Sequence, residues 1–155
     1  MALVRILVDG YSLIHSWPEL APGKPRHSAA AREELIRWLT QYRDACGTPV
    51  TIVFDGSDSG RGRKEKTSTP DVEILYSRAG QTADDIIERA AHRLAAYGEV
   101  LVVTDDLAER ETASSLGAVT SSCSSFVQTL HHALDELQRD LGRHNRKERT
   151  KYREP

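Results

Sequence analysis

The stretch LVRILVDG (residues 3–10) is an apolar run that ends abruptly in an aspartate and a glycine. Branched apolar residues favour a buried β-strand, so we predict a strand over residues 3–8. An acid that directly follows such a strand can serve the turn into the next helix or belong to a functional site. Gly10 lets the backbone approach a neighbour closely. The role of Asp9 is therefore the first question that this sequence raises.

Similar short apolar runs recur along the chain, at residues 50–54, 72–76, 100–104 and, more weakly, 118–120. Segments with helical periodicity separate them, and we predict helices over residues 28–46, 82–97 and 106–116, and a last helix that runs to residue 141. Its leucine seam can pack on the sheet or on a partner helix, and the oligomeric state stays open. Strands that alternate with helices are typical of an α/β fold with a mostly parallel sheet.

Composition limits the kinds of protein that this chain can be. With 155 residues, 39% of them hydrophobic, the chain can bury one core, and we expect one domain over residues 1–141. The net charge of -2 excludes a generally basic protein. Cys46 and Cys123 form no zinc-binding pattern and suit a reducing compartment. The apolar start is too short for a signal peptide or a membrane span, so we expect a cytoplasmic protein without a membrane partner.

Carboxylates follow the predicted strands at one edge of the predicted sheet. The carboxyl ends of parallel strands meet there, and ligands of open α/β sheets bind in that crevice. Carboxylates held close together repel one another unless a cation lies between them, and oxygen ligands suit Mg²⁺ or Mn²⁺ better than zinc. The acids at this edge are Asp9, Asp55, Asp84, Asp85, Asp105 and Asp106.

Several of these acids also have a purely structural explanation. Asp85 lies three residues after Thr82 and can complete a capping interaction, which makes Asp84 the better candidate for a functional role. Asp106 can be an N-cap, because Glu109 follows it at the spacing of a capping box. Asp55 begins an Asp-Gly pair that is common in turns.

Four motifs in order resemble the YacP-like NYN-domain proteins of the PIN-like nuclease superfamily. They are VDGYSLIHSWPEL (8–20), IVFDGS (52–57), GQTADDIIER (80–89) and VVTDDLAER (102–110). The resemblance implies a PIN-like three-layer sandwich around a parallel sheet and a metal-dependent endoribonuclease that uses Mg²⁺ or Mn²⁺. The best-known members cleave messenger RNA in association with the ribosome. A non-catalytic adaptor that binds RNA or the ribosome is the alternative.

The resemblance also implies which residues act. Asp9, Asp84 and Asp106 would be the catalytic, metal-binding acids, with Asp55 and Asp105 beside them. Ser12 stands where the family motif has asparagine, and a hydroxyl offers fewer hydrogen bonds to a water or phosphate than an amide does.

Basic and aromatic side chains indicate where RNA would bind. A short basic loop follows the second predicted strand and suits phosphate contacts, and Tyr11 can stack on an unpaired base. Residues 142–155 are predicted to be a flexible basic tail that contacts RNA or keeps the protein in solution. The basic residues of the loop are Arg61, Arg63, Lys64 and Lys66.

Overall fold

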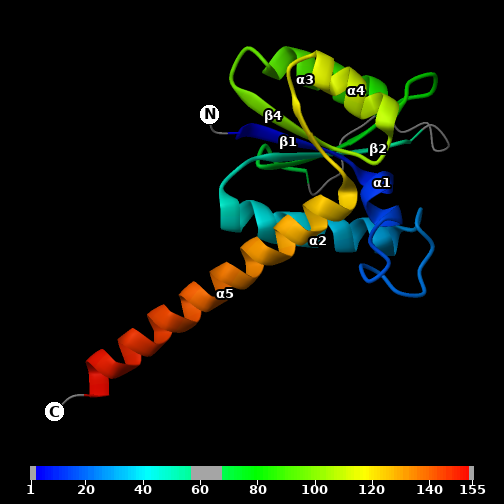
Figure 1. Ribbon diagram of the computed structural model, residues 1–155. Coiled ribbons are helices and arrows are strands. Elements are labelled where there is room, and N and C mark those ends of the chain that lie inside the picture. Colours follow the sequence, from blue (N-terminus) through cyan, green and yellow to red (C-terminus); the bar gives the residue numbers. More distant parts are fainter. Residues whose placement is uncertain (1–2, 57–67, 154–155) are drawn as a thin grey trace.

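The structure, a computed structural model, describes residues 3–56 and 68–153, and side chains as far as residue 147. Figure 1 shows a sheet with helices on both sides and a long C-terminal helix that projects from the body. The strands are β1 (Leu3–Asp9), β2 (Val50–Phe54), β3 (Val72–Tyr76), β4 (Glu99–Val103) and β5 (Val119–Ser121). The helices are α1 (Gly10–His15), α2 (Ala29–Cys46), α3 (Ala83–Leu94), α4 (Leu107–Ser115) and α5 (Cys123–Arg153).

The five strands form one sheet in the order β3-β2-β1-β4-β5, and every pairing is parallel. The predicted α/β class is therefore confirmed. The chain runs outward from β1 to β3, crosses back to β4 beside β1, and continues outward to β5. The strand order thus reverses between β1 and β4, and such a switch point opens a crevice outside the carboxyl ends of the two strands.

Two apolar cores lie on opposite faces of the sheet, as expected for strands whose side chains alternate. In β1, Ile6 and Val8 join the core beneath α1, α2 and α5, whereas Leu7 points into the core beneath α3 and α4. Figure 1 shows α3 and α4 on one side of the sheet and α2 on the other. The predicted three-layer sandwich is confirmed.

Helix boundaries follow local sequence signals. Ser28 caps the first turn of α2 through the backbone N–H of Ala31, and Gly47 ends the helix at φ 79°. Thr82 and Asp85 form a reciprocal capping box at the start of α3. These ends agree with the predicted boundaries and leave Asp84 without a capping role in the first turn of α3.

Helix α1 was not predicted, because six residues are too few to show helical periodicity. It begins directly after β1, with Asp9 as its N-cap. A Cβ atom on Gly10 would lie 2.4 Å from Cε1 of Phe54, which is fully buried. Gly10 is therefore required by the close approach of α1 to β2.

The last helix does not end at residue 141. Helix α5 continues to Arg153, so residues 142–153, predicted to be a flexible tail, are helical. Beyond the two cores this helix extends away from the body (Figure 1), and Leu141 is 53% exposed. No helix within the described ranges carries an apolar stretch that would reach across a membrane.

We predict that Gly10→Ala destabilises the protein, because the new methyl group overlaps the ring of a residue with no room to move. Overpacking of this kind costs about 1–3 kcal/mol. The matched control is Gly142→Ala in α5, where a Cβ atom meets nothing within 4 Å. Denaturant unfolding followed by circular dichroism measures both variants. Equal stability of Gly10→Ala and the wild type would contradict the packing explanation.

Candidate metal centre

Three carboxylates from distant parts of the chain meet at the β1–β4 switch point. Asp9 ends β1, Asp84 lies in the first turn of α3, and Glu109 lies in the first turn of α4. One oxygen of each lies within 4.8 Å of the others, and this is the group of acids among the described residues that could hold a metal ion. The sheet topology therefore gathers oxygen ligands exactly where an α/β fold binds its ligand.

The hydroxyl of Thr104 connects two of these acids. Thr104 is buried at the end of β4, and its Oγ1 lies 2.9 Å from Oε2 of Glu109 and 3.4 Å from Oδ2 of Asp9. The same oxygen accepts the backbone N–H of Asp106 at 3.2 Å. Because a hydroxyl has one proton, Thr104 donates to one carboxylate at a time. The other oxygen of Asp9 accepts the backbone N–H of Ser12 at 3.4 Å.

Burial and nearby negative charge make Asp9 and Glu109 reluctant to ionise without a cation. Burial, with the charge of Asp84 adding to it, raises the pKa of Asp9 to about 6. Burial is also the main reason that the pKa of Glu109 rises to about 9, and the neighbouring Asp84 carboxylate and the charge of Asp9 add to the effect. Desolvation and like charges are the two ordinary causes of a raised carboxyl pKa.

The donor set fits a divalent cation. Oε1 of Glu109 is buried and has no hydrogen-bond donor among the described residues. A buried charged oxygen without a donor is costly unless something else compensates its charge. Three carboxylate oxygens in one small volume are ligands that suit hard ions such as Mg²⁺ and Mn²⁺. Asp9, Asp84 and Glu109 are therefore the residues that could hold such an ion.

Asp106 does not belong to this group among the described residues. Its Oδ1 accepts the backbone N–H groups of Ala108 and Glu109, at 2.9 and 3.2 Å, and so caps α4. The predicted capping box is only half formed, because the backbone N–H of Asp106 donates to Thr104 and not to Glu109. The side chain of Glu109 is thereby left to point inward, toward Asp9. Asp106 positions the first turn of α4, which carries Glu109.

Asp105 ties the start of α5 to the loop that follows β4. Its Oδ1 accepts the backbone N–H of Cys123 at 2.8 Å, and its Oδ2 accepts the hydroxyl of Ser16. Burial acts to raise the pKa of Asp105, but these hydrogen bonds outweigh it and hold the pKa below its ordinary value. The backbone N–H of Asp105 donates to Oγ of Ser12 at 3.0 Å. Ser12 thus connects α1 to the β4–α4 loop, and its predicted contact with substrate stays a prediction.

The thiol of Cys123 also contacts this network, at 3.5 Å from Oγ of Ser12. Burial raises the pKa of Cys123 to about 12, so the thiol stays protonated and packs as a small apolar group.

Asp55 lies apart from the three grouped acids. It follows β2, is exposed, and its Oδ1 accepts the hydroxyl of Ser77 at 3.0 Å. The same hydroxyl accepts the backbone N–H of Gly56 at 3.0 Å, so Asp55 stabilises the turn after β2. Both structural explanations considered for the acids, a turn at Asp55 and a cap at Asp106, describe the contacts that these residues make.

The other predicted substrate contacts involve one aromatic residue and a basic loop. Tyr11 packs its ring against His27 and Phe54, with centroids 4.2 and 5.0 Å apart, and its hydroxyl accepts from Arg32 at 3.3 Å. Tyr11 is partly buried by this packing, and its contact with a base stays a prediction. The basic residues Arg61, Arg63, Lys64 and Lys66 lie outside the described residues, and their contact with RNA stays a prediction.

Glu109 was missed as a site residue because its spacing from Asp106 explained it as a cap. One signal could have found it. Glu109 and Ala113 are one helical turn apart and are the buried residues of α4. An acid on the buried face of an amphipathic helix is unusual and marks a paired or functional group.

A parallel α/β sandwich with clustered carboxylates at its switch point matches the expectation for a PIN-like nuclease. The sequence matches the model of the YacP-like NYN domain over residues 6–155, and the chain belongs to this family. NYN domains are nuclease-like, so the family indicates a nuclease-like protein with an RNA-related function.

Proteins of similar sequence and structure occur in Bacillus subtilis. The chain is 30% identical to a protein described as uncharacterized protein YacP of Bacillus subtilis (strain 168), over 92% of this chain and 81% of the relative. A crystal structure of Rae1 (YacP) from Bacillus subtilis is similar with a TM-score of 0.76, at 25% identity, over 97% of this chain and 85% of that one. A mutant of Rae1 gives the same TM-score at 26% identity, over 92% and 84% of the two chains. The resemblance seen in the motifs is confirmed.

The raised pKa values predict how the metal-free protein responds to pH. An acid whose pKa is higher in the folded state binds more protons than in the unfolded state, so stability falls as pH rises from about 4 toward the folded pKa. We expect the metal-free protein to melt at a lower temperature at pH 8 than at pH 5. Glu109→Gln should reduce this loss, whereas Glu111→Gln, an exposed change in the same helix, should not.

Addition of Mg²⁺ or Mn²⁺ should stabilise the wild type at pH 8 and leave Glu109→Gln almost unchanged. At about a hundred times its Kd, a ligand adds about 2.7 kcal/mol. Differential scanning calorimetry measures both effects. An equal response of Glu109→Gln and the wild type to the metal would remove Glu109 from the metal site.

A second pair of substitutions tests the role of Asp106. Asp106→Ser keeps an oxygen that can cap α4 but removes the negative charge, and Asp106→Ala removes both. We expect Asp106→Ala to lose about 1 kcal/mol of stability, and Asp106→Ser to retain most of both stability and Mn²⁺ affinity. Calorimetric titration with Mn²⁺ gives the affinity. Loss of Mn²⁺ binding in Asp106→Ser would make Asp106 a ligand.

Proposed function

We propose that this protein is a metal-dependent endoribonuclease that hydrolyses phosphodiester bonds in single-stranded RNA, with messenger RNA as the substrate. The observation that carries the proposal is the group formed by Asp9, Asp84 and Glu109. It lies at the switch point of a nuclease-like fold, and one of its buried oxygens has no donor among the described residues. Membership of a nuclease-like family supports the same class of activity.

Asp9, Asp84 and Glu109 would hold Mg²⁺ or Mn²⁺. Such an ion lowers the pKa of bound water and neutralises charge on a phosphodiester. The protein's own contribution is to fix the ligands. Asp9 is oriented by the backbone of α1, and Glu109 by the hydroxyl of Thr104 and by the capped first turn of α4. A ligand held in this way loses little conformational freedom on binding.

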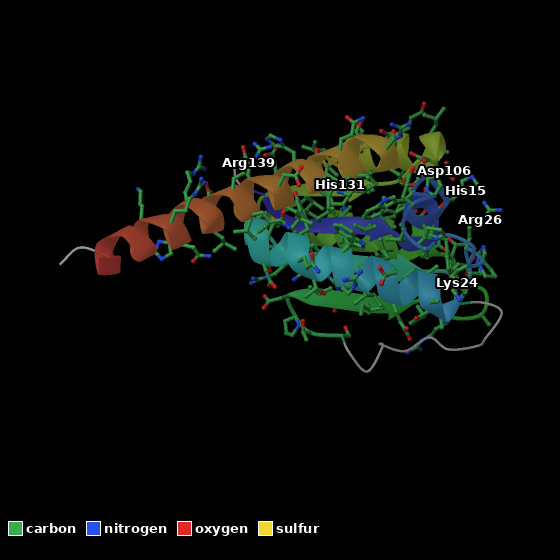
Figure 2. The ribbon with its side chains drawn as sticks, turned by 90° about the horizontal axis from the view of Figure 1, so that it is seen from below. His15, Lys24, Arg26, Asp106, His131 and Arg139 are labelled. Atoms are coloured by element: carbon green, nitrogen blue, oxygen red, sulfur yellow. The ribbon has the colours of Figure 1, made fainter. Side chains whose placement is uncertain are left out.

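Basic side chains at the end of α1 and in the segment between α1 and α2 lie at the end of the molecule that carries Asp106. His15, Lys24 and Arg26 are exposed, and the guanidinium of Arg26 donates to Nδ1 of His15. Figure 2 shows all three at the same end of the molecule as Asp106. Positive charge beside a group of acids supports binding of a polyanion, because phosphate contacts supply most of the sequence-independent affinity for nucleic acid.

The test is cleavage of an end-labelled, unstructured RNA with Mg²⁺, with Mn²⁺ and with chelator, resolved on a sequencing gel. We expect internal cuts with either metal and none with chelator. Asp9→Asn and Glu109→Gln should each reduce the rate by roughly a hundredfold or more, since loss even of groups that support metal ligands costs 10–100-fold. Glu111→Gln is the matched control and should cut at the wild-type rate.

Two outcomes would contradict the proposal. Cleavage that persists in Asp9→Asn and in Glu109→Gln would mean that these carboxylates are not the site. If the wild type binds RNA but does not cut it, even when the RNA is engaged on ribosomes, the protein is an RNA-binding or ribosome-binding adaptor.

A further inference from the structure

A second candidate binding site lies on the face of the sheet beside α3, away from the group of acids. It is a pocket of about 320 Å³ between α3 and the half of the sheet formed by β1, β2 and β3. Pockets that take small-molecule ligands begin at about 300 Å³, so this volume suits a group the size of a nucleotide. The pocket exists because α3 packs on β1, β2 and β4 and leaves the outer strand β3 open beside it.

The pocket combines an apolar floor with a rim that is mainly cationic. Leu7, Leu75 and Ile86 contribute apolar surface, and Arg5, Arg89 and Arg93 contribute guanidinium groups. One carboxylate, that of Glu73, also lines the pocket, and it accepts the hydroxyl of Thr51 at 3.2 Å. Arg5 is already held, because it donates to Oγ1 of Thr51 at 3.0 Å and to the carbonyl of Pro70 at 3.4 Å.

Arg89 and Arg93 are both exposed on α3, and within the described ranges neither makes a hydrogen bond or an ion pair. Residues four apart on a helix lie on the same face, so the two guanidinium groups rise side by side along the pocket. Paired arginines with free donors, next to apolar surface, match a ligand that carries phosphate on an apolar or aromatic body.

The position of the pocket relative to the acids indicates which ligand this is. Gln81, at one end of the pocket, lies three residues before Asp84 in the chain. At 1.5 Å per residue, Arg89 and Arg93 are about 7.5 and 13.5 Å from Asp84 along the axis of α3. Asp84 and the two arginines lie on opposite sides of the buried face of α3. An RNA strand that reaches both must therefore pass over the start of α3.

We propose that this pocket binds a nucleotide of the same single-stranded RNA whose backbone reaches the group of acids. Arg89 and Arg93 contact its phosphates, and the base lies on the apolar floor. This inference rests on the proposed function only in taking RNA as the ligand. It adds a second contact for the RNA strand, on the opposite side of α3 from Asp84 and away from the site of cleavage.

The test measures binding in the presence of chelator, so that cleavage plays no part. A fluorescently labelled single-stranded RNA of ten nucleotides is titrated with the wild type, Arg89→Ala, Arg93→Ala and the double variant, at several salt concentrations. We expect roughly tenfold weaker binding for the double variant at about 0.1 M salt. Its salt slope should fall by about 1.4, because each single-strand phosphate contact contributes about 0.7.

A charge-neutral variant separates the pocket from general electrostatic attraction. Ala90 lines the pocket, and Ala90→Phe fills it without altering charge. We expect this variant to weaken RNA binding while leaving the salt slope nearly unchanged. Arg37→Ala is the matched control, because Arg37 is an exposed arginine of α2 that pairs with Glu34. Thermal melting shows that each variant is folded.

Unchanged affinity in the double variant, or in Ala90→Phe, would overturn the inference. Titration with uridine monophosphate distinguishes a free nucleotide from a strand. If the monophosphate binds in a way that Ala90→Phe abolishes, while RNA affinity is unaffected, the pocket belongs to a free nucleotide and the proposal is wrong. Because none of these measurements requires cleavage, the inference can fail while the nuclease activity stands, and the activity can fail while the inference stands.

Discussion

The architecture of the site depends on three carboxylates held together against their own repulsion. Asp9, Asp84 and Glu109 converge at the end of the central strand, and burial makes the negative charges of Asp9 and Glu109 harder to maintain. The surrounding contacts restrain this arrangement. Thr104 lies between two of the acids, α1 starts from Asp9 itself, and the cap on α4 fixes the backbone that carries Glu109. Holding these oxygen ligands together therefore lowers the local stability of the fold.

Sequence reasoning predicted the framework because strong, local signals specify it. The apolar runs at residues 50–54 and 72–76 are strands with exactly the predicted ends, and the ends of β1 and β4 differ by one residue. Parallel strands then bring their carboxyl ends together without further information. That argument placed Asp9 and Asp84 near one another, and in the structure they share one group.

The roles that sequence reasoning missed are set by the direction in which a helix face points and by contacts between distant segments. Glu109 and Asp106 lie in the same turn, and only the direction of α4 decides which carboxylate faces Asp9. Ser12 accepts a hydrogen bond from the backbone of Asp105, a residue far along the chain, which the sequence pattern did not indicate. The predicted end of the last helix at residue 141 is too early. The polar sequence after Leu141 gives no apolar face, but this sequence still continues the helix.

The order of the strands means that the group of three acids cannot be complete before β4 and α4 have been synthesised. Asp9 stands near the beginning of the chain and Glu109 a hundred residues later, and β4 must insert beside β1 before the two can meet. During synthesis the chain therefore emerges without a functional centre, and it acquires one only when α4 has left the ribosome and docked. The proposed nuclease would thus be inert toward its own message for most of the time that the message is being translated.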